Sequence, residues 1–203
     1  KINLCNIHFS DRFPLSPLHW ILADKEGAIT VESIEGGLRI YENPVGVLTN
    51  NPAFDYHMIH LCDYMNVTPL SPENRFGDVT LTTYSRGMGA IGLPGDLSSA
   101  SRFVRAAFVK LNSVSGDSEN ESVNQFFHIL GAVEQQRGCA RLPDGSFEIT
   151  VYTSCMNTDK GIYYYTTYEN RCISAVDMHR CELEGKELYT YPLIKKQEII
   201  RQN

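Results

Sequence analysis

Hydrophobic and β-branched positions between residues 18 and 49 fall in short runs, separated by turns that carry glycine or proline. Runs of this kind predict antiparallel strands joined by hairpins. We expect strands at 18–24, 28–33, 37–42 and 45–49.

The hydrophobic spacing then changes to that of a helix. Asn51 and Pro52 have the residue types of an N-cap and a first helical position. The residues that follow at helical spacing form one apolar stripe: Phe54, Met58, Leu61 and Met65. Residues 66–95 show no clear period and contain many glycines and prolines, a pattern typical of a functional or assembly segment.

Two further helices are predicted downstream. One covers 99–111, with an apolar face formed by Val104, Ala107, Phe108 and Leu111. The other follows Ser118, whose spacing to Glu121 matches a capping box. Its apolar face is expected to contain Val123, Phe126, Phe127, Leu130 and Val133.

The last zone returns to strands, expected at 146–154, 161–169, 172–178 and 187–193. Pro143, Asp144 and Gly145 predict a turn before them, because proline presets φ and glycine accepts a positive φ. The order of strands, helices and strands predicts an α+β fold. No linker is visible, so we expect one domain over 1–203.

The charge, apolar content and cysteine content of the chain argue against several classes of function. Eighteen basic against 24 acidic residues give a net charge of −6, which argues against a nucleic-acid partner. No apolar run is long enough for a membrane span. The six cysteines contain no Cys-x-x-Cys pair and are too sparse for a disulfide framework, so we expect reduced thiols and a cytoplasmic location. The chain begins with lysine and shows no signal peptide, so we expect a processed product or a fragment.

Three motifs have more ordinary interpretations than their chemical ones. Gly87–Gly92 matches G-x-G-x-x-G, but Pro94 and Gly95 prevent a helix from starting there, which argues against a dinucleotide site. His57 and His60 lack an identifiable third ligand, so a solvated or hydrogen-bonded helix face is favoured over a metal site. Cys5 would be a nucleophile only after removal of four residues, and a buried thiol is favoured.

Asn50 and Arg102 are the more informative pair. A carboxamide at the end of a strand can donate its N–H to a developing oxyanion, whereas ordinary turn chemistry is the alternative for Asn50. If Ser98 or Ser99 caps the helix, Arg102 lies in its first turn, where the helix dipole disfavours a cation. A local rule broken in this way points to function or strain.

Six segments resemble the choloylglycine hydrolase family, in a single colinear register. They are LSPLHWILAD (15–24), NPVGVLTNNPAFDYH (43–57), YSRGMGAIGLPGDLSSASRFVRAAF (84–108), SVNQFFHIL (122–130), YTSCMNTDKGIYYYTTYEN (152–170) and AVDM (175–178). The resemblance is closest to the conjugated bile salt hydrolases of intestinal bacteria, and penicillin V acylase is a sister branch.

This resemblance implies an N-terminal-nucleophile fold with αββα layers and no cofactor or metal. It implies cleavage of the amide that joins a bile acid to glycine or taurine, by an N-terminal cysteine whose own amino group is the base. Neither that cysteine nor its neighbouring Arg and Asp segment is present. We therefore expect a C-terminal fragment that lacks roughly the first third of the enzyme and is inactive alone.

The downstream family residues match positions in this sequence. The resemblance assigns the oxyanion-hole asparagine to Asn50 and the active-site arginine to Arg102. It assigns Phe9 and Phe13 to the apolar walls of the substrate pocket, and residues 65–83 to an arm that forms a homotetramer. Two alternatives stay open: a non-catalytic bile-acid-binding or structural remnant, and a penicillin V acylase.

Overall fold

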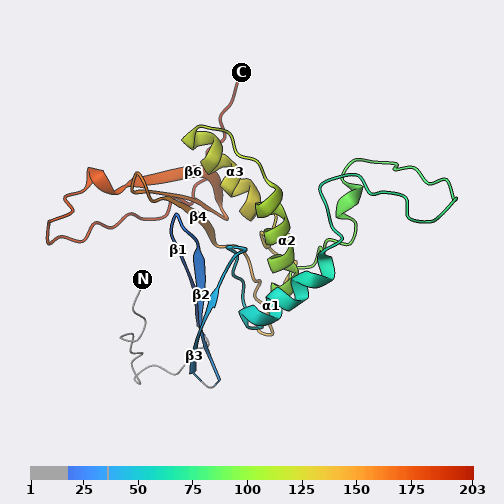
Figure 1. Ribbon diagram of the computed structural model, residues 1–203. Coiled ribbons are helices and arrows are strands. Elements are labelled where there is room, and N and C mark those ends of the chain that lie inside the picture. Colours follow the sequence, from blue (N-terminus) through green and yellow to red (C-terminus); the bar gives the residue numbers. More distant parts are fainter. Residues whose placement is uncertain (1–17, 36) are drawn as a thin grey trace. The chain divides into compact units, whose positions relative to one another are not determined.

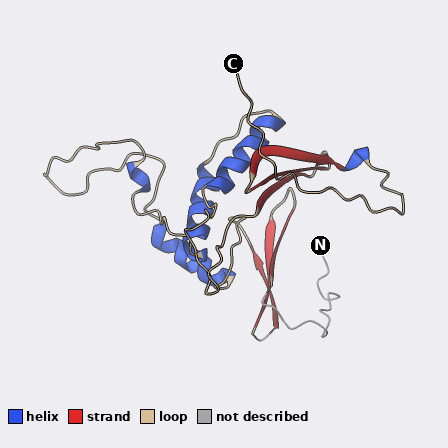
Figure 2. Cartoon of the chain, turned by 180° about the vertical axis from the view of Figure 1, so that it is seen from behind, coloured by secondary structure: helices blue, strands red, loops and turns tan. Residues whose placement is uncertain are grey.

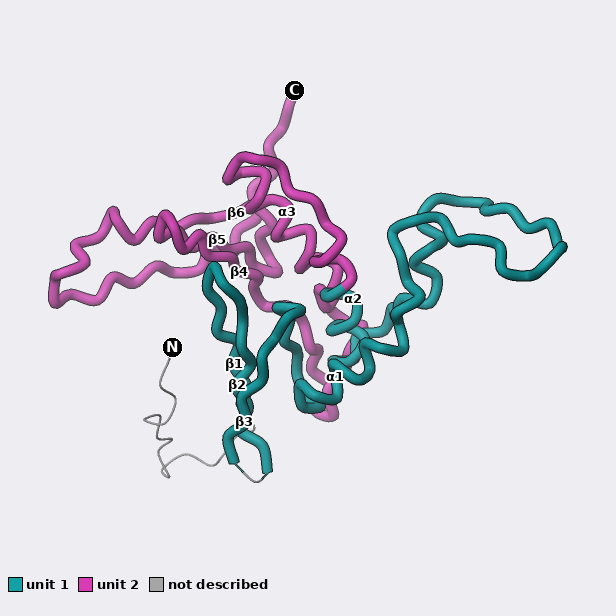
Figure 3. Tube along the Cα trace, viewed as in Figure 1, with its two compact units in different colours: residues 1–107 teal, residues 108–203 magenta. Residues whose placement is uncertain are grey.

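The computed structural model describes residues 18–35 and 37–203 (Figure 1). Two compact units divide the chain, one formed by residues 1–107 and the other by 108–203 (Figure 3). Cys5, Phe9 and Phe13 lie outside the described residues, and a single domain over 1–203 stays a prediction.

The first unit contains an antiparallel sheet in the order β1 (His19–Ala23), β2 (Ala28–Ile34) and β3 (Gly37–Glu42), which confirms the first three predicted strands. The strand predicted at 45–49 is wrong. The Asn43 side chain accepts from the Gly46 N–H at 2.7 Å and donates to the Val47 carbonyl at 2.9 Å. These bonds hold the chain in a turn, so Val47 is buried without strand pairing.

Helix α1 (Phe54–Leu61) begins later than Asn51 and Pro52 predicted. The buried carboxylate of Glu32, on β2, accepts the Phe54 N–H at 2.9 Å and so satisfies a donor at the helix start. The Asn51–Pro52 peptide bond is cis.

The apolar stripe predicted on this helix is buried at Phe54, half-buried at Met58 and Leu61, and exposed at Met65. Phe54 is buried, but Met65 is 84% exposed because α1 gives way to the short 3-10 helix η2 (Cys62–Tyr64). His57, predicted on a solvated or hydrogen-bonded face, is hydrogen-bonded to the Asn50 carbonyl and fully buried, not solvated. Its ring stacks on Phe103 at 4.8 Å between centroids.

Residues 66–95 are irregular, as predicted, apart from the short 3-10 helix η3 (Met88–Ala90), and Figure 2 shows a long loop. The base of this loop is closed by a hydrogen bond from the Thr68 N–H to the Gly89 carbonyl at 2.9 Å. A Cβ on Gly89 would overlap the backbone oxygens of Thr68 and Leu70, so only glycine fits this close approach. No α-helix starts at Gly92, in agreement with the analysis of the glycine motif.

Helix α2 (Ser99–Asn112) confirms the helix predicted over 99–111. The prediction of its buried face is correct for Val104 and Ala107, which are buried. Leu111 is 60% exposed, however, whereas Phe103 is fully buried and lies 6.0 Å from Phe54 between ring centroids. The buried face of α2 is therefore the one that carries Phe103 and contacts α1 within the first unit.

The second unit contains α3 (Glu119–Gly131), which begins with the predicted capping box between Ser118 and Glu121. Its antiparallel sheet has the order β4 (Tyr152–Asn157), β5 (Ile162–Thr167) and β6 (Asn170–Asp177), followed by the 3-10 helix η4 (Met178–Arg180). The strands predicted at 161–169 and 172–178 are therefore present, whereas the one predicted at 146–154 begins only at Tyr152. The turn at Gly145 has the expected positive φ of 85°.

The strand predicted at 187–193 is wrong. Pro192 has no N–H to donate to a ladder, and the Ile194 N–H bonds the Tyr165 hydroxyl at 3.3 Å instead of a strand backbone. Leu188 is 92% exposed, so this segment does not contribute to the core.

Glu119, the first residue of α3, ties that helix to the β4–β5 hairpin. Its carboxylate accepts from Asn157 at 2.5 Å, from Lys160 at 2.6 Å and from the Tyr164 hydroxyl at 3.0 Å. The hydrogen bond from Lys160, more than the other two, lowers the pKa of Glu119. The carboxylate at the helix N-terminus is also favourably placed with respect to the helix dipole.

Candidate active site

Asn50 and Arg102, separated by 52 positions in the sequence, are brought into direct contact. The Arg102 guanidinium donates through one terminal nitrogen to Asn50 Oδ1 at 2.6 Å. Its Nε donates to the Leu97 carbonyl at 3.1 Å. Asn50 lies on the segment that precedes α1, and Arg102 lies in the first turn of α2, as predicted.

The contact with Arg102 fixes which way the Asn50 amide points. A guanidinium has only donors, so the atom that faces it must be the carbonyl oxygen of the amide. The amide nitrogen Nδ2 therefore points away from Arg102. Asn50 thus presents an N–H donor whose orientation is set by a charged neighbour.

The backbone carbonyl of Asn50 is held as well. It accepts from the Ser99 hydroxyl at 2.6 Å and from Nε2 of His57 at 2.9 Å. The hydroxyl oxygen of Thr49 lies 3.1 Å from that of Ser99 and 3.3 Å from His57 Nε2. Both the carbonyl and the side-chain oxygen of Asn50 therefore have fixed donors.

These contacts define the tautomer of His57. A backbone carbonyl can only accept, so Nε2 carries the proton. Nδ1 is buried without a hydrogen-bond partner in the described part of the chain. The ring packs against Phe103.

A carboxylate organises the start of α2, where Arg102 lies. Asp96 accepts from the Ser98 N–H at 2.9 Å and from the Ser101 hydroxyl at 2.5 Å. The hydroxyl of Ser98 accepts the Ser101 N–H at 3.3 Å, the contact of an N-cap. The hydrogen bonds from Ser101 and then from Ser98 hold the pKa of Asp96 well below its usual range.

The Asp96 contacts lead to a pH-dependent prediction. Because the folded-state pKa lies below the ordinary value of 3.8, the stability that Asp96 contributes is present above that value and is lost as the pH falls further. Asp96→Asn is therefore expected to lower the melting temperature of the 203-residue chain near pH 7. The difference from the parent should shrink below about pH 4.

Melting curves between pH 2 and pH 7, followed by circular dichroism, measure this effect. The matched control is Asp78→Asn, at an exposed aspartate in the 66–95 loop. A difference between parent and Asp96→Asn that is the same at every pH would contradict the prediction.

The sequence predicts the two central residues, Asn50 and Arg102, but not Ser99 and His57, which contact Asn50. The sequence predicts Ser99 only as a possible cap, and it predicts a solvated or hydrogen-bonded helix face for His57 without naming Asn50 as its partner. A signal was present for Ser99, since it lies three positions before Arg102 and so on the same side of the helix. No local pattern indicated that His57 is buried against Phe103.

Among the residues that the structure describes, the remaining titratable candidates do not form a metal site. His60 pairs with Asp63 at 3.3 Å on the surface, and no group of three or more His, Cys, Asp or Glu side chains lies close enough to hold a metal over residues 18–35 and 37–203. None of the helices described is both long and apolar enough to cross a membrane.

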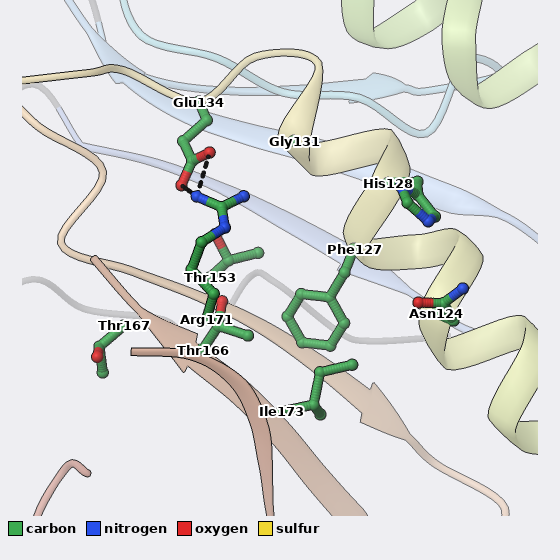
Figure 4. A pocket seen from close by; sticks show the side chains of 10 residues that line it. All are labelled: Asn124, Phe127, His128, Gly131, Glu134, Thr153, Thr166, Thr167, Arg171 and Ile173. Carbon is green, nitrogen blue, oxygen red and sulfur yellow. Dashed lines mark hydrogen bonds and ion pairs between the residues drawn. The ribbon is translucent and has the colours of Figure 1, made fainter. Parts of the chain in front are cut away.

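A cavity of about 150 Å³ lies in the second unit, between α3 and the sheet (Figure 4). Phe127 and Ile173 line it together with the ion pair of Arg171 and Glu134, at 3.2 Å. The cavity contains none of the predicted site residues, and it is smaller than the roughly 300–1,000 Å³ of a ligand pocket. It is too small for a steroid.

Comparison with known proteins identifies the family. Residues 1–191 match the model of the linear amide C-N hydrolases, choloylglycine hydrolase family. The chain is 57% identical, over 95% of its length, to a bile salt hydrolase/transferase of Lactiplantibacillus plantarum, and 42% identical, over 93%, to one of Clostridium perfringens. It spans 60% and 58% of these two relatives.

Solved structures agree with this result. A mutant of the conjugated bile acid hydrolase of Clostridium perfringens superposes with a TM-score of 0.83 at 41% identity, over 96% of this chain and 60% of that one. Penicillin V acylase from Agrobacterium tumefaciens, at a TM-score of 0.61 and 20% identity over 80% of this chain and 45% of that one, shares the fold alone. The predicted α+β fold of the N-terminal-nucleophile hydrolases is thereby confirmed. The chain belongs to the choloylglycine hydrolase family of linear amide C–N hydrolases.

Proposed function

We propose that this chain forms part of an enzyme that hydrolyses the amide bond of glycine- or taurine-conjugated bile salts. The observation that carries the proposal is the fixed amide of Asn50, whose N–H is oriented by Arg102. The names of the relatives support the substrate class. The nucleophile would be an N-terminal cysteine outside these 203 residues.

In the proposed reaction the cysteine thiolate attacks the amide carbonyl carbon. A C–S bond forms, and the π electron pair moves to the carbonyl oxygen, which becomes an oxyanion. Asn50 Nδ2 donates a hydrogen bond to that oxygen, and a donor already in place lowers the barrier because nothing needs to reorganise. Collapse breaks the C–N bond, the amine leaves with the proton taken from the thiol, and water then cleaves the thioester.

Arg102 would have two roles in this reaction. Its guanidinium holds Asn50 Oδ1 at 2.6 Å and so keeps the amide donor aimed. Its positive charge would also favour the thiolate form of a nearby cysteine. Phe9 and Phe13 would supply apolar walls for the steroid.

We also propose that the 65–83 arm makes contacts in a homotetramer, in the cytoplasm. Large hydrophobic side chains of this arm are exposed: Met65, Leu70, Phe76, Val79 and Leu81. Apolar surface of this kind is typical of an interface between subunits.

A chimera tests the proposed function. In it, this chain replaces the matching part of the Lactiplantibacillus plantarum relative, so that the rest of the enzyme is supplied. We expect the chimera to release glycine or taurine from conjugated bile salts, and the 203-residue chain alone to release neither, because acyl transfer needs a thiolate with an adjacent base.

Three outcomes would contradict the proposal. Release by the chain alone that is abolished by Cys5→Ala would assign the nucleophile to Cys5. A folded chimera that binds bile salts without hydrolysis would favour a non-catalytic remnant. Cleavage of penicillin V in preference to bile salts would favour the acylase.

A further inference from the structure

The first turn of α2 holds Asn50 at two separate points. Arg102 donates to its side-chain oxygen, and Ser99, three positions earlier on the same helix, donates to its backbone carbonyl. His57, from α1, donates to the same carbonyl at 2.9 Å. Two helices thus meet on one residue of the segment before α1.

We propose that Ser99 and His57 are positioning residues that act through the Asn50 carbonyl to aim its Nδ2. The proposal rests on the proposed function, in which Nδ2 donates to the oxyanion. A carbonyl that receives two hydrogen bonds, on both of its lone pairs, cannot rotate without losing one of them. The orientation of the Asn50 peptide group is therefore fixed, and with it the direction in which the side chain leaves the backbone.

Ser99 is free for this role because the cap of α2 is supplied by its neighbour. The Ser98 hydroxyl accepts the Ser101 N–H, whereas the Ser99 hydroxyl makes its 2.6 Å bond to Asn50 instead. A matched pair of substitutions follows. Ser98→Ala weakens the helix start alone, and Ser99→Ala removes the contact with Asn50.

The His57 ring contacts the core through Phe103 and contacts the Asn50 carbonyl through Nε2. Its ring is fully buried and stacks on Phe103 with an interplanar angle of 11°. The buried Nδ1 has no partner among the described residues, and Nε2 lies 2.9 Å from the Asn50 carbonyl and 3.3 Å from the Thr49 hydroxyl, so the Asn50 carbonyl is the nearer partner of the imidazole. His57→Phe keeps a stacked ring and removes the donor.

Steady-state kinetics of the chimera test the proposal. Ser99→Ala and His57→Phe are each expected to lower kcat about tenfold and to leave KM unchanged, a smaller loss than removal of the oxyanion donor itself. Ser99→Thr keeps the hydroxyl and should restore most of kcat. Ser98→Ala should lower the melting temperature and leave kcat unchanged.

The double variant separates positioning from structural support. In an Asn50→Ala background no amide remains to be aimed, so Ser99→Ala should cause no further loss of kcat. The same tenfold loss in both backgrounds, or a rise in KM at constant kcat, would overturn the proposal.

A second readout needs no substrate and uses the 203-residue chain. The side-chain amide signals of Asn50 in a ¹⁵N spectrum are assigned by their loss in Asn50→Ala. They are expected to shift or broaden in Ser99→Ala and to stay in place in Ser98→Ala. Unchanged signals in Ser99→Ala would overturn the positioning role even if the chimera proved inactive, and inactivity alone would contradict only the proposed function.

Discussion

Asn50→Ala is expected to lower kcat of the chimera by about 10²–10³, with KM nearly unchanged. The reason is that Nδ2 would donate to a charge that exists only in the tetrahedral state, so its loss raises the barrier and leaves substrate binding intact. Hydrolysis rates measured over a range of bile salt concentrations separate kcat from KM.

A sharper variant isolates the donor from the rest of the side chain. Asn50→Asp keeps an oxygen for Arg102 but replaces the N–H donor with a second oxygen, so we expect a loss at least as large. Asn51→Ala, at the exposed neighbouring asparagine, is the control and should keep its activity. If Asn50→Ala raises KM at constant kcat, Asn50 is a turn residue or a ground-state contact.

Arg102→Gln is expected to raise the apparent pKa of the nucleophilic thiol of the chimera. A guanidinium near a thiol favours the thiolate, and glutamine removes that charge while it keeps a donor. Less thiolate is then present at any pH below the new pKa, so alkylation by iodoacetamide near pH 6 should slow about tenfold. The measurement is the alkylation rate as a function of pH in both proteins.

Thermal melts of the same two proteins distinguish a structural arginine from a functional one. Arg102 lies at the positive end of the α2 dipole, so the substitution should leave the melting temperature unchanged or slightly higher. An unshifted alkylation profile together with a much lower melting temperature would assign Arg102 to the scaffold.

Local signals predicted the elements of this chain better than their ends. The Ser118 capping box and the Gly145 turn are encoded within a few residues, and both are present. The start of α1 depends instead on the carboxylate of Glu32, which is 22 positions away in the sequence. No local pattern contains that hydrogen bond.

In the candidate site, too, the sequence predicts features that depend on nearby residues and misses those that depend on distant contacts. The sequence indicates Asn50 because it ends a predicted strand, and Arg102 because a cation is unfavourable in the first turn of a helix. Both residues also lie in segments that resemble the family. For His57 the sequence predicts a solvated or hydrogen-bonded face, since histidine at helical spacing does not by itself indicate burial. Its place against Phe103 follows from the packing of α1 on α2, which the sequence pattern does not contain.

The hydrogen bond between Thr68 and Gly89 makes the stability of the rest of the protein nearly independent of the length of the 66–95 loop. Thr68 and Gly89 close the base of the 66–95 loop by a backbone hydrogen bond, and the entropy of closing a loop grows only with the logarithm of its length. Insertions and deletions between residues 71 and 87 should therefore change the free energy of unfolding little, provided that the Thr68–Gly89 hydrogen bond is kept. Changes in sequence and length at the tip of the loop can therefore accumulate without disturbing the helices that hold Asn50.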